Sequence, residues 1–248
     1  MPPPDPKPRV VPALPMQAVY YDRAHFNNQF DASVDRRNRT VTLIMSLDFT
    51  MVGWGNTPQE YVSKVAQTFM TDMKDVVQKG WSAQYGIQWA YDSFPDRYKA
   101  KVEVVLDGKY AFSRPCPAHV QIGIHPNTPG ARSCAGGGGG GLQESDNVAK
   151  EHVRTLFLDA KGKATKDYTF YQITTVHEFG HMMGLDHIAG KGNDTRDYGM
   201  TPELARDIMG SGSIVSERDY EPFLRIMKRY GEDYLPSGEN KWKLVAKE

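Results

Sequence analysis

The chain has 248 residues, and its 30 lysines and arginines balance its 30 aspartates and glutamates, so the formal net charge is zero. This balance argues against binding to nucleic acid or to an anionic membrane, which both favour a basic surface. The apolar runs are strand-sized and too short to span a membrane. We therefore expect one substantial domain with appendages, assumed to be a monomer.

The first 37 residues are expected to form a proline-rich, irregular segment. Prolines occupy seven of the first fifteen positions, and no apolar core of a signal peptide is present. Such a composition favours extended, solvated chain. The segment is either a linker from a longer protein or a mature N-terminus after processing.

An alternating strand followed by an amphipathic helix begins the predicted domain. Residues 40–49 alternate between apolar and polar side chains, which predicts a half-buried strand. A helix is predicted from Thr57 as N-cap, with Pro58 at its first position, to a stop at Gly80. Its apolar stripe is expected to pack on the sheet and consists of Tyr61, Val65, Phe69, Met73 and Val76.

Four further strands are predicted, at residues 85–91, 102–106, 120–124 and 153–158. The segment 126–141 contains six consecutive glycines and is expected to be a mobile loop. It is either a flap over a cleft or a surface insertion. Two cysteines, Cys116 and Cys134, either form a disulfide worth about 3 kcal/mol in an oxidising compartment or remain separate thiols.

Residues 177–187 read HEFGHMMGLDH and fit the pattern H-E-x-x-H-x-x-G-x-x-H. On a helix, His177 and His181 lie one above the other and can bind one metal ion. Gly184 allows the chain to leave the helix, and His187 returns as a third nitrogen ligand. Three protein ligands leave one position open, as in a catalytic zinc site, with Glu178 placed to reach a water there.

The environment of this motif is also predicted. Thr169 and Gln172 are expected to form a capping box at the start of the helix. Its buried side is expected to comprise Val176, Phe179 and Met183.

A final helix is expected after the motif. It should be capped by Ser216, kinked or delayed at Pro222 and ended at Gly231, and should bury Phe223, Ile226, Met227 and Tyr230.

The motif resembles that of the metzincin clan of zinc metallopeptidases. The order strand, helix, four strands, helix is similar to the N-terminal subdomain of that clan. The resemblance implies an α+β fold with a twisted, mostly parallel five-stranded sheet, a backing helix, an active-site helix and a small C-terminal subdomain with a methionine turn. It implies a domain at 38–231, divided into 38–184 and 185–231, with a tail at 232–248.

The resemblance also implies roles for single residues. His177, His181 and His187 would bind one Zn²⁺, Glu178 would be the general base, and Met209 would lie beneath the metal. The fourth strand would be the sheet edge that pairs with an extended polypeptide substrate. The substrate-binding candidates on that strand are His119, Gln121, Gly123 and His125.

Two positions depart from the familiar families of the clan. Ile188 follows the third histidine, and Ser211 stands where some families have a tyrosine that assists the metal. Tyr198 and Tyr220 are candidates to replace that tyrosine. Oxygen ligands for Ca²⁺ are available in a loop, at Asn193, Asp194 and Asp197, although these residue types are also common in turns.

The sequence therefore predicts a zinc-dependent endopeptidase that acts outside the cell that produces it, by secretion or delivery. Two alternatives remain open. The protein could be a zinc amidase that acts on a cell-wall peptide or another small amide. It could be a protease toxin module delivered from a larger protein. A non-catalytic binding domain is disfavoured, because such a domain has no need of Glu178.

Overall fold

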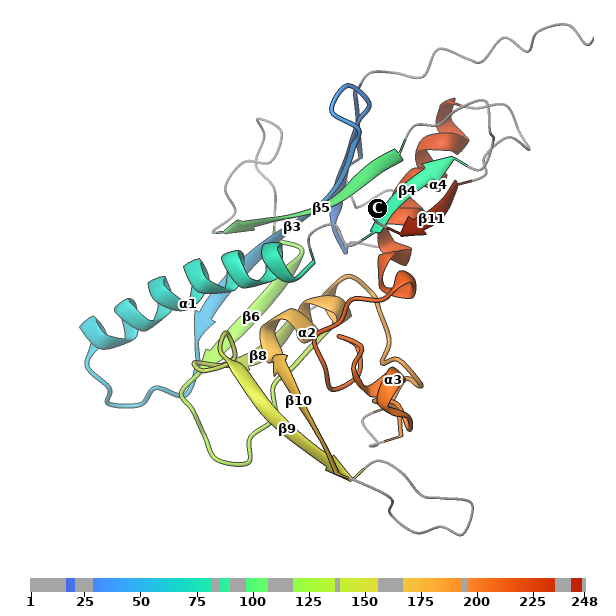
Figure 1. The fold of residues 1–248 in the computed structure, drawn as a ribbon. Coiled ribbons are helices and arrows are strands. Elements are labelled where there is room, and N and C mark those ends of the chain that lie inside the picture. The colour runs from blue at the N-terminus through green and yellow to red at the C-terminus, as the bar shows by residue number, and fades with distance from the viewer. Residues whose placement is uncertain are drawn as a thin grey trace, which may run out of the picture.

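The computed structural model describes residues 17–20, 29–81, 85–89, 97–106, 118–136, 139–155, 167–192, 196–234 and 242–246. These residues form an α+β fold in which helices pack on a mixed sheet (Figure 1). Among the described helices, none is long and apolar enough to cross a membrane.

Seven strands of the sheet follow the order β11-β4-β5-β3-β6-β8-β7, while β2 pairs with β3 and β1 pairs with β2. The pairs β3–β5, β3–β6 and β6–β8 are parallel, whereas β4, β7, β11 and the β1–β2 hairpin pair antiparallel. The sheet is therefore mixed, and the expectation of a mostly parallel five-stranded sheet was wrong. The strands are β1 Gln17–Tyr20, β2 Asp31–Asp35, β3 Thr40–Met51, β4 Tyr85–Trp89, β5 Arg97–Leu106, β6 Val120–His125, β7 Cys134–Gly136, β8 Gly139–Gln143 and β11 Trp242–Ala246.

The long strand β3 lies at the centre of the sheet and confirms the first predicted strand. One side of β3 pairs with β5, and the other pairs with β2 at its start and β6 at its end. The predicted inward residues Val41, Leu43, Met45 and Leu47 are buried and Phe49 is partly buried, but Ile44 and Ser46 on the opposite face are buried too. Both faces of β3 are therefore enclosed, rather than one as the alternation predicted.

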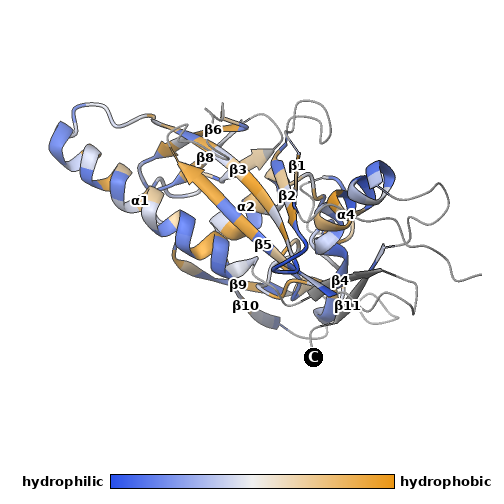
Figure 2. Cartoon of the chain, turned by 90° about the horizontal axis from the view of Figure 1, so that it is seen from above, coloured by the Kyte–Doolittle hydropathy of each residue, from blue (hydrophilic) through white to orange (hydrophobic). Residues whose placement is uncertain are grey.

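Helix α1 spans Gln59–Gly80, and Pro58 rather than Thr57 occupies its N-cap position without a side-chain cap. Tyr61 does not belong to the buried stripe. Its side chain is exposed, and its hydroxyl donates to Glu144 Oε1 at 3.1 Å. The outward side of α1 is mainly hydrophilic (Figure 2). The buried residues are Val62, Phe69, Met73 and Val77, which keep the helical period with a shifted phase.

The glycine-rich part of this segment forms strands where the structure describes it, in β7 and β8, so the expectation of a loop was wrong there, whereas residues 126–133 lie in turns and loops. Strand β8 pairs in parallel with β6 over residues 121–125, and β7 pairs antiparallel with β8. A ladder needs only backbone donors and acceptors, which glycine supplies. Because β8 covers the free side of β6, β6 is an inner strand and not the sheet edge.

The predicted fifth strand leaves the main sheet. It is β9, Ala149–Thr155, and it pairs antiparallel with β10, Asp167–Ile173, as a separate two-stranded sheet. Strand β10 runs directly into helix α2, Thr174–Met182. The expected capping box was wrong, because Thr169 and Gln172 lie within β10 and the N-cap residue is Ile173 without a side-chain hydrogen bond.

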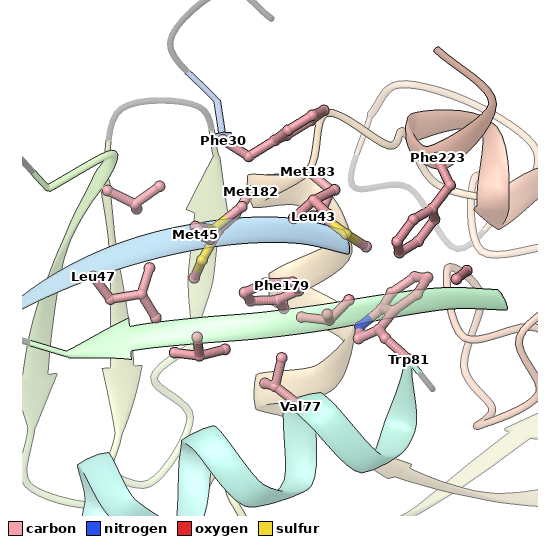
Figure 3. Packing of buried hydrophobic residues seen from close by; sticks show 14 of the residues in the cluster. Phe30, Leu43, Met45, Leu47, Val77, Trp81, Phe179, Met182, Met183 and Phe223 are labelled. Atoms are coloured by element: carbon pink, nitrogen blue, oxygen red, sulfur yellow. The ribbon is translucent and has the colours of Figure 1, made fainter. Parts of the chain in front are cut away.

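The buried side of α2 is confirmed. Val176, Phe179 and Met183 are buried and meet side chains of β3 and α1 in one core cluster (Figure 3). The indole of Trp81, at the end of α1, donates to the carbonyl of Val176 at 3.0 Å. The core thus fixes the helix that carries the histidine motif.

The C-terminal part contains α3, Pro202–Ala205, a 3-10 turn at Glu217–Tyr220 (η2) and α4, Glu221–Tyr234. Ser216 caps η2 together with Asp219, as expected. The α-helix itself begins only at Glu221, which confirms the late start expected near Pro222. Gly231 does not end α4, because the helix continues to Tyr234, and Gly231 is buried within it. The four predicted core residues, Phe223, Ile226, Met227 and Tyr230, are all buried.

Within the expected C-terminal tail, strand β11 pairs antiparallel with β4 at the end of the sheet. Cys134 is exposed and has no disulfide partner among the described residues. Its expected partner Cys116 lies outside the described residues, as do Asn193 and Asp194 of the candidate calcium loop.

Candidate metal centre

Three histidines from the motif converge. His177 and His181 project from α2, and His187 follows in the next loop. One ring nitrogen from each lies within 4.8 Å of the others, and the Nε2 atoms of His181 and His187 are 3.1 Å apart. Among the described residues this is the group that could hold a metal ion, as the spacing of the motif predicted.

Backbone carbonyls fix the orientation of all three rings. The Nδ1 atoms of His177, His181 and His187 lie 2.6, 2.8 and 2.6 Å from the oxygens of Ile208, Leu185 and Gly192 respectively. A carbonyl oxygen only accepts hydrogen bonds, so each Nδ1 carries the proton and each Nε2 carries a lone pair. The lone pairs of His181 and His187 then face each other, an arrangement that a cation between them stabilises.

The protonation of the rings also suits a metal. Burial lowers the pKa of His177 to about 3, because the charged imidazolium loses its hydration. Burial is also the main cause that lowers the pKa of His181 and of His187. Neutral imidazole is the form that binds metals, and three such donors suit zinc, copper, iron or nickel. The side chains therefore fit the metal that the motif implies.

The end of α2 sets the position of the third histidine. Gly184 has a φ of +89°, in the left-handed region that favours glycine. Its N–H donates to the His181 carbonyl at 2.9 Å, and the N–H of Leu185 donates to the Gly180 carbonyl at 3.0 Å. This pair of bonds is a Schellman motif. It turns the chain sharply, and Arg218 then donates to the carbonyls of Ile188 and His187.

The predicted methionine turn lies against the centre. The N–H of Gly210 donates to the Asp207 carbonyl at 2.9 Å, which closes a turn around the buried Met209. The sulfur of Met209 packs against Gly180, where a methyl group would collide with it. The turn therefore contacts the middle of α2.

Gln172 has a role that the sequence did not reveal. Its Nε2 lies 3.1 Å from each of three carbonyl oxygens, those of Ile208, Gly210 and Gly212. The amide thereby ties β10 to the methionine turn. The capping-box interpretation missed this role because the partners lie 36 to 40 residues away.

Glu178 lies beside the cluster, between two hollows in the surface. Its Oε2 accepts a hydrogen bond from the N–H of Ala135 at 2.7 Å. Burial raises the pKa of Glu178 to about 8, and the bond from Ala135 opposes this rise. A cation held by the neighbouring imidazoles would favour the carboxylate form.

The two hollows have volumes of about 380 and 400 Å³. Both are lined by Glu178, Arg132, Ser133 and Tyr198, so they adjoin each other at the metal centre. The first extends toward β9 and Ser211, and the second extends toward the loop of His187. A ligand at the centre thus has space on both sides of Glu178.

The two candidate tyrosines, Tyr198 and Tyr220, lie in different surroundings. The Tyr198 ring lies 4.0 Å from the His187 ring, centroid to centroid, and it lines both hollows. Burial is the main cause that raises the pKa of its hydroxyl. Tyr220 is fully buried, packs on Phe223 and lies 3.5 Å from the Trp81 carbonyl. Tyr198 is therefore the one that adjoins the metal centre.

The four substrate-binding candidates lie on or next to the inner strand β6. His119 is packed away from the hollows, since its Nδ1 accepts from the N–H of Ser46 at 2.9 Å and its Nε2 lies 3.6 Å from Asp31. Gln121, Gly123 and His125 lie in register with β8. None of the four is among the described residues that line the two hollows.

Several hollow-lining residues escaped the sequence interpretation, among them Arg132, Asp146 and Arg154. Arg132 lies in the segment that was expected to be a loop, and Arg154 lies on the strand that was expected in the main sheet. No local sequence pattern marked any of the three residues as part of a site. The sequence matches no protein-family model, and no curated protein matches it.

Proposed function

We propose that the protein is a zinc-dependent endopeptidase of the metzincin type. The observation that carries the proposal is the convergence of three carbonyl-oriented imidazoles beside a buried glutamate. The donor set, the Schellman turn at Gly184 and the methionine turn at Met209 support it together. No single one of them is specific to peptide hydrolysis.

His177, His181 and His187 would hold the ion. Zinc supplies a Lewis acid that lowers the pKa of water and polarises a carbonyl group. The carboxylate of Glu178 accepts a proton from the attacking water and delivers it to the nitrogen of the leaving amine. Ala135 orients this carboxylate through its N–H, and the surrounding burial limits competing solvent.

The two adjoining hollows favour a polymer over a small amide. A polypeptide that crosses the centre would place residues in both hollows, on either side of the scissile bond. The end of the main sheet beside α2 is β7, not β6. We therefore assign strand addition by the substrate to the region of β7.

The test is cleavage of casein or gelatin by zinc-loaded protein, with and without chelator. Glu178→Gln should retain one zinc per chain and lose about 10²- to 10⁴-fold in turnover. The matched control is Glu103→Gln, at an exposed carboxylate on β5. Full turnover in Glu178→Gln, or cleavage that persists in the metal-free protein, would contradict the proposal.

A further inference from the structure

The run of six glycines at 136–141 is a feature of the sequence that the proposed function does not explain. Where the structure describes it, the run forms the end of β7 and the start of β8. Glycine weakens a strand, because it loses more conformational freedom than other residues and packs no side chain. Within a strand it often marks a point where another backbone approaches closely. The surroundings of each glycine therefore indicate which of them the fold requires.

Gly140 is the position where two backbones approach closely. A Cβ atom there would lie 2.7 Å from both the Cα and the Cβ of Ala135, and it would collide with the carbonyl oxygen of Cys134. Ala135 is the residue opposite Gly140 in the pairing of β7 with β8. Opposite residues in a regular antiparallel pair keep their Cβ atoms about 4.5–5.5 Å apart. Strand β7 therefore leans over one face of β8, which is possible because position 140 has no side chain.

The glycines on either side of Gly140 face β6 instead. Successive Cβ positions in a strand point to opposite faces. A Cβ atom at Gly141 would lie 3.1 Å from Nε2 of His125, and one at Gly139 would lie 3.0 Å from the carbonyl oxygen of Gln121. Both partners belong to β6. Of these three glycines, Gly140 is therefore the one that allows β7 to cross over β8.

This path brings the backbone of β7 to the proposed general base. Strand β7 packs on α2, and the N–H of Ala135 donates to Glu178 Oε2 at 2.7 Å. Because this N–H is directed at Glu178, it takes no part in the ladder with β8. A hydrogen bond to a carboxylate is charge-assisted and stronger than a neutral one. One oxygen of Glu178 is thus engaged by the main chain, and the other is left to accept the proton of the attacking water.

We propose that Gly140 is a positioning residue for the general base. The absence of a side chain at position 140 lets β7 lean over β8, and the Ala135 N–H then holds the Glu178 carboxylate in the orientation that accepts the proton. The inference rests on the proposed peptidase function and adds a residue that lies outside the zinc motif. The imidazoles are oriented by carbonyls of other segments, at residues 185, 192 and 208, so a change at Gly140 should leave the metal bound.

The first test observes the bond itself and needs no turnover. The amide of Ala135 is followed by NMR in zinc-loaded wild-type and Gly140→Ala proteins. We expect its hydrogen exchange to be about tenfold or more faster in the variant, because a bond to a charged group is lost, and its proton resonance to move upfield. Glu178→Gln should also move this resonance upfield.

Gly141→Ala is the matched control for this test. It makes the same substitution one residue further along β8, on the opposite face, where the contact is the side chain of His125. The Ala135 amide should keep its wild-type resonance and exchange rate in this variant. An unchanged Ala135 amide in folded, zinc-loaded Gly140→Ala protein would overturn the inference.

The second test asks whether Gly140 acts through Glu178, by means of a double-mutant cycle. Gly140→Ala should lower turnover of a fluorogenic peptide about 10²-fold in the wild-type background, because a displaced base no longer reaches the water. In the Glu178→Gln background the same substitution should cost less than about threefold. Zinc should remain at one per chain in all four proteins. Equal losses in the two backgrounds would show a merely structural role and would overturn the inference.

Ala135→Pro keeps the inference testable if Gly140→Ala does not fold. Proline is tolerated at a sheet edge where its missing N–H is not needed by the ladder, and β7 ends the strand order of the sheet. This variant should also lose about 10²-fold in turnover and retain its zinc. Full turnover in Ala135→Pro would overturn the inference and leave the peptidase function standing. Absence of cleavage by wild-type protein would instead contradict the peptidase function, while the amide measurement still decides whether Gly140 maintains the bond between Ala135 and Glu178.

Discussion

Two regions meet at the metal centre, and they are built in different ways. The floor comprises α2 and the loop up to residue 192, together with the methionine turn at 207–212. Its polar contacts run mainly to backbone carbonyls, as in the three histidine Nδ1 bonds and the amide of Gln172. The wall comprises residues 131–136 and 143–154, and besides backbone contacts it contains bonds between charged or polar side chains, such as Lys150 with Asp146 and Arg154 with Ser211.

We infer that the floor serves the proposed metal site and that the wall serves the proposed binding of substrate. Backbone carbonyls stay where the fold places them, so the floor presents the imidazoles in one orientation and one tautomer. The side-chain contacts of the wall depend on single side chains, which a substitution can replace without moving the histidines. We therefore expect changes in the floor to affect metal binding, and changes in the wall to affect substrate binding and turnover.

The largest effect is expected from removing a floor ligand. His187→Ala should weaken zinc binding by more than about 100-fold, since even the loss of a group that supports a ligand costs 10- to 100-fold. The measurement is metal content after dialysis against a weak chelator. His125→Ala, on β6 outside the cluster, is the control and should retain its zinc. Stoichiometric zinc in His187→Ala would remove that histidine from the site.

A wall substitution should destabilise the protein while sparing the metal. Asp146→Ala leaves Lys150 Nζ and the N–H of Gln143 without their carboxylate, and Asp146 is only 1% exposed. We expect a loss of about 2–3 kcal/mol in the free energy of unfolding, measured with urea. Zinc stoichiometry should remain at one. Loss of zinc by the folded variant would contradict the expectation that the wall does not support metal binding.

The contact between helix α2 and the methionine turn can be tested at Gly180. A methyl group there would collide with the sulfur of Met209 and approach Trp81. Gly180→Ala should therefore lower the free energy of unfolding by about 1–2 kcal/mol and weaken zinc binding. Val148→Ala, at an exposed position of the wall, should change stability by less than about 0.5 kcal/mol. A fully stable Gly180→Ala protein would show that the methionine turn does not press on α2.

A pH dependence is expected at the edge of the floor. Burial, and then the nearby Asp207, raise the pKa of Asp219 to about 7, and Arg218 opposes the rise. The unfolded state loses this proton near pH 4, whereas the folded state keeps it until about pH 7. The contribution of the group to stability is therefore present below pH 4 and is lost as the pH rises to 7.

Asp219→Asn should reduce this decline, because asparagine cannot ionise but keeps an acceptor for the N–H of Ser216, which lies 2.6 Å from Asp219 Oδ2. The measurement is urea unfolding of both proteins at pH 5 and pH 7.5. The same loss of stability in both would contradict the shifted pKa.

The sequence predicted the floor well because its signals are local. The histidines at 177 and 181 are one helical turn apart, and Gly184 is required by the left-handed turn that follows. The cluster of three histidines agrees with what this spacing predicted, and the burial of Met209 agrees with what the resemblance implied. The zinc and the general base remain proposals, because the geometry alone does not identify a metal or a reaction.

The wall and the sheet order were predicted poorly because their contacts are long-range. Glycines carry no side-chain pattern, so the pairing of β8 with β6 left no signal in the sequence, and β6 was wrongly taken as the edge. Arg154 and Ser211 meet across 57 residues. Such a contact depends on where β9 and the methionine turn lie in the fold, which no local period encodes.

The most direct test of the central claim is X-ray absorption spectroscopy of the zinc-loaded protein, combined with its metal stoichiometry. Our account predicts one zinc per chain with three imidazole nitrogens at about 2.0–2.1 Å and one further light ligand. His187→Ala should lose this signature. Zinc that binds without stoichiometry, or a coordination shell with fewer than three imidazoles, would contradict the account.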